Sequence, residues 1–133
     1  MNVHTQNETR FKAPVNSAVW FEIPVTNMEK AKEFYSKVLM TEFADMNDAP
    51  NPMSVFGYGK GEKDVSGHLY PGKPAPSGTG PTIHLAVADD LSAAMERVTA
   101  AGGTVVSPII EIPEGRFAYC EDLDGNSISL FAA

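Results

Sequence analysis

The chain has 133 residues, of which 43% are hydrophobic and 20% are charged, so it is long and apolar enough to fold around one core. Its 17 Asp and Glu residues outnumber its 10 Lys and Arg residues. The resulting formal net charge of −7 argues against binding to nucleic acids or to anionic membranes. A single cysteine, Cys120, excludes an intrachain disulfide and favours a reducing, cytoplasmic location. We find no apolar run typical of a signal peptide or of a membrane span.

Residues 1–17 form a polar lead-in, and we expect residues 18–133 to form a single domain. The first predicted strand covers residues 19–25, where apolar side chains recur at every second position, as on a strand with two unlike faces. Pro24 has no backbone N–H to donate, so this strand should lie at the edge of its sheet or end at Pro24. The core face would carry Val19, Phe21, Ile23 and Val25, and the opposite face Trp20, Glu22 and Pro24.

A helix is predicted from Met28 to Leu39, because apolar residues recur there at spacings of three and four while Lys and Glu cover the other side. Asn27 precedes it as a suitable N-cap. Three short strands should follow, at about residues 41–46, 53–58 and 65–70, separated by runs rich in turn residues.

Residues 71–81 contain four prolines and three glycines and read as a linker between two modules, at about 18–72 and 81–133. After the linker the same pattern starts again, with an alternating strand over residues 82–87. Asp89 or Asp90 should cap a second helix that runs to about Ala101 and ends at Gly102-Gly103. The remaining strands are predicted at residues 104–106, 116–121 and 127–131.

The two halves therefore share one order of elements, which predicts an α+β domain made of two βαβββ modules related by a pseudo-twofold axis. The alternative is an ordinary α+β sandwich whose halves are alike by chance. An offset of 62 residues aligns Val25 with Val87, Asn27 with Asp89, Glu22 with His84 and Trp20 with Thr82.

In this order and spacing, three stretches resemble the vicinal-oxygen-chelate family, which includes glyoxalase I, extradiol dioxygenases and drug-sequestering bleomycin-resistance proteins. They are residues 20–35 around the first helix, Ala101-Gly102-Gly103-Thr104-Val105, and residues 121–126, Glu-Asp-Leu-Asp-Gly-Asn. The resemblance covers about residues 18–132. It implies a glyoxalase-like fold in which the curled sheets form a partly closed barrel around a cavity, and it implies a homodimer.

The sequence departs from the family at the positions where metal-using members place His, Gln or Glu. The first-strand position holds Trp20, the fifth-strand position Thr82 and the final-strand position Ser129. The fourth-strand position falls on Gly67 or His68, and the register stays open. We therefore expect no metal cofactor, with a divalent ion (Zn, Ni, Fe or Mn) as the alternative.

Strand alternation places several polar and aromatic side chains opposite the aliphatic faces, where a curled sheet would gather them around a small-molecule pocket. We expect ligand contacts from Trp20, which could stack on a planar ligand, and from His68, Thr82, Ser129 and Phe131. Glu22 and His84 are the catalytic candidates, as an acid/base pair or, with His68, as a two-His-one-carboxylate metal site. The plainer alternative is that they are hydrogen-bonded polar residues in a wet cavity.

Three functions fit these residues. The first is a module that binds or sequesters a small organic molecule without metal and without turnover. The second is a glyoxalase-like lyase, isomerase or oxygenase that uses Glu22 and His84, with or without a divalent metal. The third is a dimerising structural partner, whose cavity could be shared so that Glu22 and His68 of one chain meet His84 of another.

Overall fold

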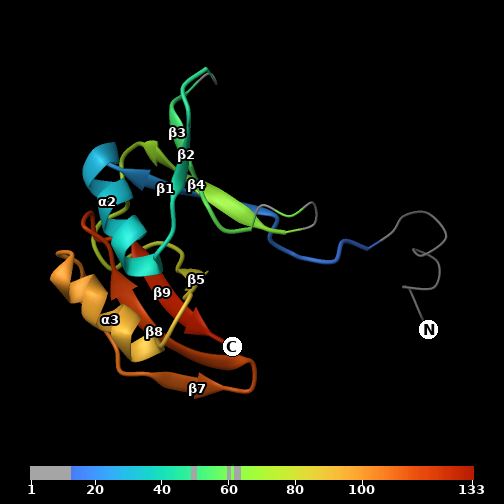
Figure 1. Cartoon of the computed structure of the whole chain (residues 1–133), viewed down its shortest axis with the longest axis vertical. Coiled ribbons are helices and arrows are strands. Elements are labelled where there is room, and N and C mark those ends of the chain that lie inside the picture. Colours follow the sequence, from blue (N-terminus) through green and yellow to red (C-terminus); the bar gives the residue numbers. More distant parts are fainter. Residues whose placement is uncertain (1–12, 49–50, 60, 62–63) are drawn as a thin grey trace.

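The computed structural model describes residues 13–48, 51–59, 61 and 64–133. It confirms the predicted α+β fold: two modules, each with a helix after its first strand, follow one another along the chain (Figure 1). The first module contains β1 (Trp20–Val25), α2 (Met28–Leu39), β2 (Phe43–Met46), β3 (Met53–Phe56) and β4 (Ser66–Pro71). The second contains β5 (Ile83–Ala86), α3 (Leu91–Ala100), β6 (Thr104–Val105), β7 (Ile110–Ile112), β8 (Gly115–Glu121) and β9 (Ser127–Ala132).

Each module folds into one curled sheet with the same strand order, β1-β4-β3-β2 in the first and β5-β9-β8-β6 in the second. In both, the first strand runs parallel to the last, so Glu22 lies opposite His68 and His84 lies opposite Ser129. These matching registers agree with the 62-residue repeat. β1 is an edge strand, as Pro24 requires.

One strand was not predicted. β7 pairs with β8 and gives the second sheet a fifth strand that the first sheet lacks. It is three residues long and lies between Pro108 and Pro113, so it offers too few positions for an alternating pattern.

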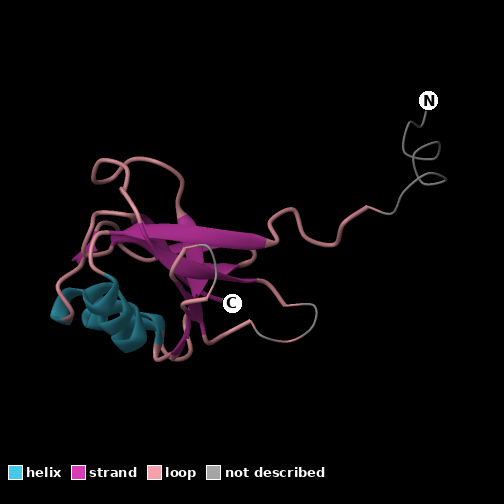
Figure 2. Ribbon diagram, turned by 90° about the horizontal axis from the view of Figure 1, so that it is seen from above, coloured by secondary structure: helices cyan, strands magenta, loops and turns pink. Residues whose placement is uncertain are grey.

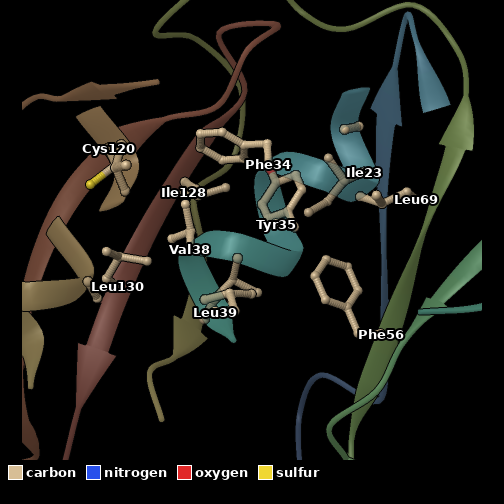
Figure 3. Packing of buried hydrophobic residues seen from close by; sticks show 14 of the residues in the cluster. Ile23, Phe34, Tyr35, Val38, Leu39, Phe56, Leu69, Cys120, Ile128 and Leu130 are labelled. Carbon is tan, nitrogen blue, oxygen red and sulfur yellow. The ribbon is translucent and has the colours of Figure 1, made fainter. Parts of the chain in front are cut away.

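The helices share one core with both sheets. Asn27 accepts a hydrogen bond from the backbone N–H of Lys30 and so caps α2, and Asp90 caps α3 in the same way. Both helices lie together along one side of the strands (Figure 2). Phe34 and Tyr35 of α2 project between the two sheets (Figure 3), in one continuous hydrophobic cluster. Burial of the helix-facing sides leaves the opposite faces of the sheets available for a site.

The turn between β8 and β9 ties the second module to the first. The buried carboxylate of Asp122 accepts a hydrogen bond of 2.6 Å from the hydroxyl of Tyr35 on α2. Asn126 donates to the carbonyl oxygen of Pro24 at 2.8 Å, which fixes β1 beside this turn. In the described part of the chain, no helix is both long and apolar enough to cross a bilayer.

Candidate functional site

The strand register settles which residue of β4 shares a face with Glu22. His68 lies opposite Glu22, on the face of the first sheet that points away from the helices. Gly67 points to the helix side, where a Cβ atom would lie only 2.4 Å from the carbonyl oxygen of Phe21 and 2.5 Å from its ring. The fourth-strand position of the family pattern is therefore His68, because the close approach of Phe21 reserves position 67 for glycine.

A chain of hydrogen bonds joins Trp20, His68 and Glu22. The indole Nε1–H of Trp20 donates to Nδ1 of His68 over 2.9 Å, and Nε2 of His68 lies 3.1 Å from Oε1 of Glu22. An indole N–H can only donate, so Nδ1 must accept, and the proton of a neutral His68 is on Nε2, facing the carboxylate. The His68 side chain is buried, whereas that of Glu22 is 63% exposed. Both imidazole nitrogens are thus engaged, and neither is free to meet a ligand or a metal.

A hollow between the two modules brings Trp20, Thr82 and His84 together. We call it the intermodule pocket; its volume is about 460 Å³ and its walls come from the β1 side of the first sheet and from β5 of the second. The lining residues are Ala18, Trp20, Phe21, Leu39, Phe56, Tyr58, Val65, Ser66, Thr82, Ile83, His84, Leu85 and Ala86. The indole of Trp20 and the imidazole of His84 therefore line one common hollow.

Glu22 and His68 line a different hollow, on the outer face of the first sheet. It has a volume of about 430 Å³ and is also lined by Met53 and Tyr70. The structure therefore corrects the expected pairing of Glu22 with His84: Glu22 pairs with His68, and His84 lines the other hollow. The physical reason is the register, which sets His68, and not His84, directly beside Glu22 on the neighbouring strand.

His84 lies among aromatic rings on the outer face of the second sheet. Its ring centroid is 5.1 Å from that of Phe117 and 6.0 Å from that of Phe131, both nearly edge-to-face. The adjacent Ser129 is fully buried, and its hydroxyl oxygen lies 3.5 Å from the carbonyl oxygen of Leu130. Of the two β9 residues expected to contact ligand, Phe131 contacts the ring of His84 and Ser129 pairs with His84 on the neighbouring strand; neither is among the residues that line the intermodule pocket.

Sequence reasoning missed Ser66, which lines the intermodule pocket and lies opposite Trp20 in the sheet register. The alternation of a strand could have identified it, because Ser66, His68 and Tyr70 stand at every second position of β4 and so share one face. Sequence reasoning also missed Phe117, which contacts the ring of His84. Phe117 lies opposite Phe131 in the register of β8 and β9.

The residues present do not fit the metal site of metal-using relatives. At the four usual positions the chain has an indole, an imidazole and two hydroxyls, and the imidazole is already bonded at both nitrogens. Among the residues that the structure describes, no three His, Cys, Asp or Glu side chains converge in a way that could hold a metal ion. Glu22, His68 and His84 therefore do not form the expected two-His-one-carboxylate cluster within one chain.

The family model of the glyoxalase/bleomycin resistance protein/dioxygenase superfamily matches residues 17–130. The chain belongs to this superfamily. The match spans both modules and both walls of the intermodule pocket.

Solved structures of this superfamily share the fold. A glyoxalase/bleomycin resistance protein from Streptomyces sp. CB03234 is 31% identical, with a TM-score of 0.65, and the match covers 87% of this chain and 100% of that one. TnmS3, an antibiotic binding protein from the same organism, is 29% identical, with a TM-score of 0.62, over 90% of this chain and 98% of that one.

Curated relatives exist in mycobacteria. The CFP32 proteins of Mycobacterium bovis and Mycobacterium tuberculosis, provisionally named glyoxylases, are 27% identical over 117 residues, or 86% of this chain. The chain spans only 44% of the length of these relatives, so it corresponds to less than half of each.

Proposed function

We propose that this superfamily member binds a small organic molecule in the intermodule pocket and holds it without a metal ion and without converting it. The observation that carries the proposal is the pocket itself: about 460 Å³, mostly apolar walls from both modules, and the only tryptophan of the chain on its rim. Ligand sites are commonly concave and apolar with a few placed polar groups, and their volumes lie in this range.

The hydrogen bonds around His68 support binding over catalysis. A general base needs a free nitrogen or oxygen within reach of the substrate proton, and His68 uses both nitrogens on Trp20 and Glu22. His84 lines the pocket, but its neighbours there are aromatic rings rather than a carboxylate. The likeness to TnmS3, an antibiotic binding protein, also supports binding over catalysis.

We further propose that the chain forms a homodimer, as the family resemblance implies. Light scattering on the purified chain would test it.

The test combines metal analysis with a ligand screen by thermal shift. We expect less than about 0.1 equivalent of transition metal per chain and a melting temperature that EDTA leaves unchanged. Compounds that raise the melting temperature bind the native state, by mass action. We expect Ala86→Phe, which fills the pocket, to remove that rise, whereas Val106→Phe, a matched change at an exposed position outside the pocket, should keep it.

The identified compounds would then be incubated with the protein and recovered for mass spectrometry. Recovery of each compound unchanged supports sequestration. A stoichiometric metal, or a product that forms with wild-type protein but not with Ala86→Phe, would contradict the proposal.

A further inference from the structure

A hydroxyl without a partner lies in the wall of the intermodule pocket. Ser66 is only 6% exposed, and among the described residues its Oγ is the one buried side-chain nitrogen or oxygen that makes no hydrogen bond. Buried polar groups are normally paired, so an unpaired one in a pocket wall marks a place where a ligand atom can bind. Because a hydroxyl can donate and accept, either a hydroxyl or a carbonyl group of a ligand would satisfy it.

The rest of the lining has no fixed charge. None of its 13 residues is Asp, Glu, Lys or Arg. Its titratable side chains are His84 and Tyr58, and the Tyr58 hydroxyl already donates to the carbonyl oxygen of Met40 at 2.7 Å, at the end of α2. A charged ligand group would lose its water here without meeting an opposite charge, which is costly. The lining therefore favours an uncharged ligand.

Trp20 adds a requirement of shape. The indole N–H of Trp20 already donates a hydrogen bond to His68, and the residue remains 47% exposed. His68 is itself held by Glu22, so the plane of the indole is fixed by a buried imidazole rather than free to rotate. An oriented aromatic face favours a flat, aromatic partner that can stack on it.

We propose that the ligand is an uncharged, planar aromatic molecule that stacks on Trp20 and hydrogen-bonds to the Ser66 hydroxyl through one hydroxyl or carbonyl group. His68 and Glu22 act as positioning residues for the indole. This inference rests on the proposed function and narrows it to a chemical class.

Four matched probes test the class. 2-Naphthol is flat, uncharged at pH 7 and has one hydroxyl; naphthalene lacks the hydroxyl, 2-naphthoate adds a charge, and decahydro-2-naphthol loses planarity. Binding is followed by calorimetry and by the indole N–H signal of ¹⁵N-labelled protein, which is a single signal because Trp20 is the only tryptophan. We expect 2-naphthol to bind and to shift this signal, and the charged and the non-planar probes to bind at least about tenfold more weakly.

Ser66→Ala tests the hydrogen bond. The variant should weaken 2-naphthol by about three- to tenfold, the usual range for one neutral hydrogen bond, and leave naphthalene unchanged. Comparing both probes on both proteins separates loss of the bond from a general change of the pocket.

His68→Leu and His68→Asn test the positioning role. Leucine removes the acceptor for Trp20, so the indole N–H signal of the free protein should move and 2-naphthol should bind more weakly. Asparagine can place its amide oxygen near Nδ1, so His68→Asn should restore much of the wild-type signal and affinity. A purely structural role for His68 would not be rescued in this way.

Two failures can be told apart. If no probe and no screened compound binds, the proposed function itself is wrong. If compounds bind but 2-naphthoate matches 2-naphthol, or Ser66→Ala weakens both naphthalene and 2-naphthol equally, only the assignment of ligand class is overturned.

Discussion

The only cysteine shows how burial decides the chemistry of one residue. Cys120 is 1% exposed on β8, and loss of hydration raises the pKa of its thiol to about 11. The thiolate is the reactive form, so the native thiol should be inert at neutral pH. The sequence favours a small buried hydrophobe over a nucleophile here, because Cys120 lies on a predicted strand and has no histidine near it in sequence.

We therefore expect Cys120 to react with Ellman's reagent at pH 8 at least about 100-fold more slowly in the folded protein than in urea. Absorbance at saturating reagent measures both rates. A reaction in buffer that nearly matches the unfolded rate would show that β8 opens freely, and would contradict a rigid second sheet. Cys120→Ala supplies the blank.

Among the secondary-structure elements, α3 supports the end of α2 through one side chain. Arg97 donates from Nε and Nη2 to the carbonyl oxygen of Val38, over 3.2 and 3.0 Å, where the last carbonyls of a helix lack partners. The same guanidinium bonds Asp89 at 2.7 and 2.9 Å. These hydrogen bonds from Arg97 lower the pKa of Asp89. The planar guanidinium makes two hydrogen bonds to each of these groups, and a lysine ammonium, with three donors, could not make all four.

Arg97→Met keeps the aliphatic stem and removes these donors, so we expect it to lower the free energy of unfolding by about 1–2 kcal/mol. Urea denaturation at pH 7 measures the change. Lys37→Met is the matched control, because among the residues that the structure describes Lys37 pairs only with Glu33, on the exposed side of α2, and the change should cost no more than about 0.5 kcal/mol. Equal effects of the two changes would show that the bond to Val38 contributes little.

Local patterns in the sequence predicted most of these elements and part of the site. Apolar spacing and an N-cap fixed α2, and alternation identified the outward faces that carry Trp20 and His84. What local patterns could not supply was register between strands. The pairing of Glu22 with His68 depends on how β1 slides against β4, and a one-residue shift would exchange His68 for Gly67. The pairing of Ser129 with His84 likewise depends on the register between β5 and β9.

The whole molecule is held together by polar contacts as well as by its shared core. Asp122 accepts hydrogen bonds from Tyr35 of the first module and from the backbone N–H groups of Asp124 and Asn126 in its own turn. Burial, with the neighbouring Asp122 charge, raises the pKa of Tyr35 well above its ordinary value, so the hydroxyl stays a donor in alkaline solution. One carboxylate therefore fixes the turn and joins the modules.

Because the core and this carboxylate are common to both modules, we expect the chain to unfold in a single cooperative transition. Tyr35→Phe should lower the free energy of unfolding by about 1–2 kcal/mol, and Asp122→Ala, which leaves several buried donors unpaired, by about 3 kcal/mol or more. Thr26→Ala, which removes only the exposed hydroxyl bond to Asp124 and keeps the bond from the backbone N–H, should change it by no more than about 0.5 kcal/mol. Urea denaturation followed by Trp20 fluorescence reports the first module, and far-ultraviolet circular dichroism reports both. Coincident curves that shift together in Asp122→Ala would support one unit, whereas curves that separate would show that the modules, and with them the walls of the intermodule pocket, are only loosely joined.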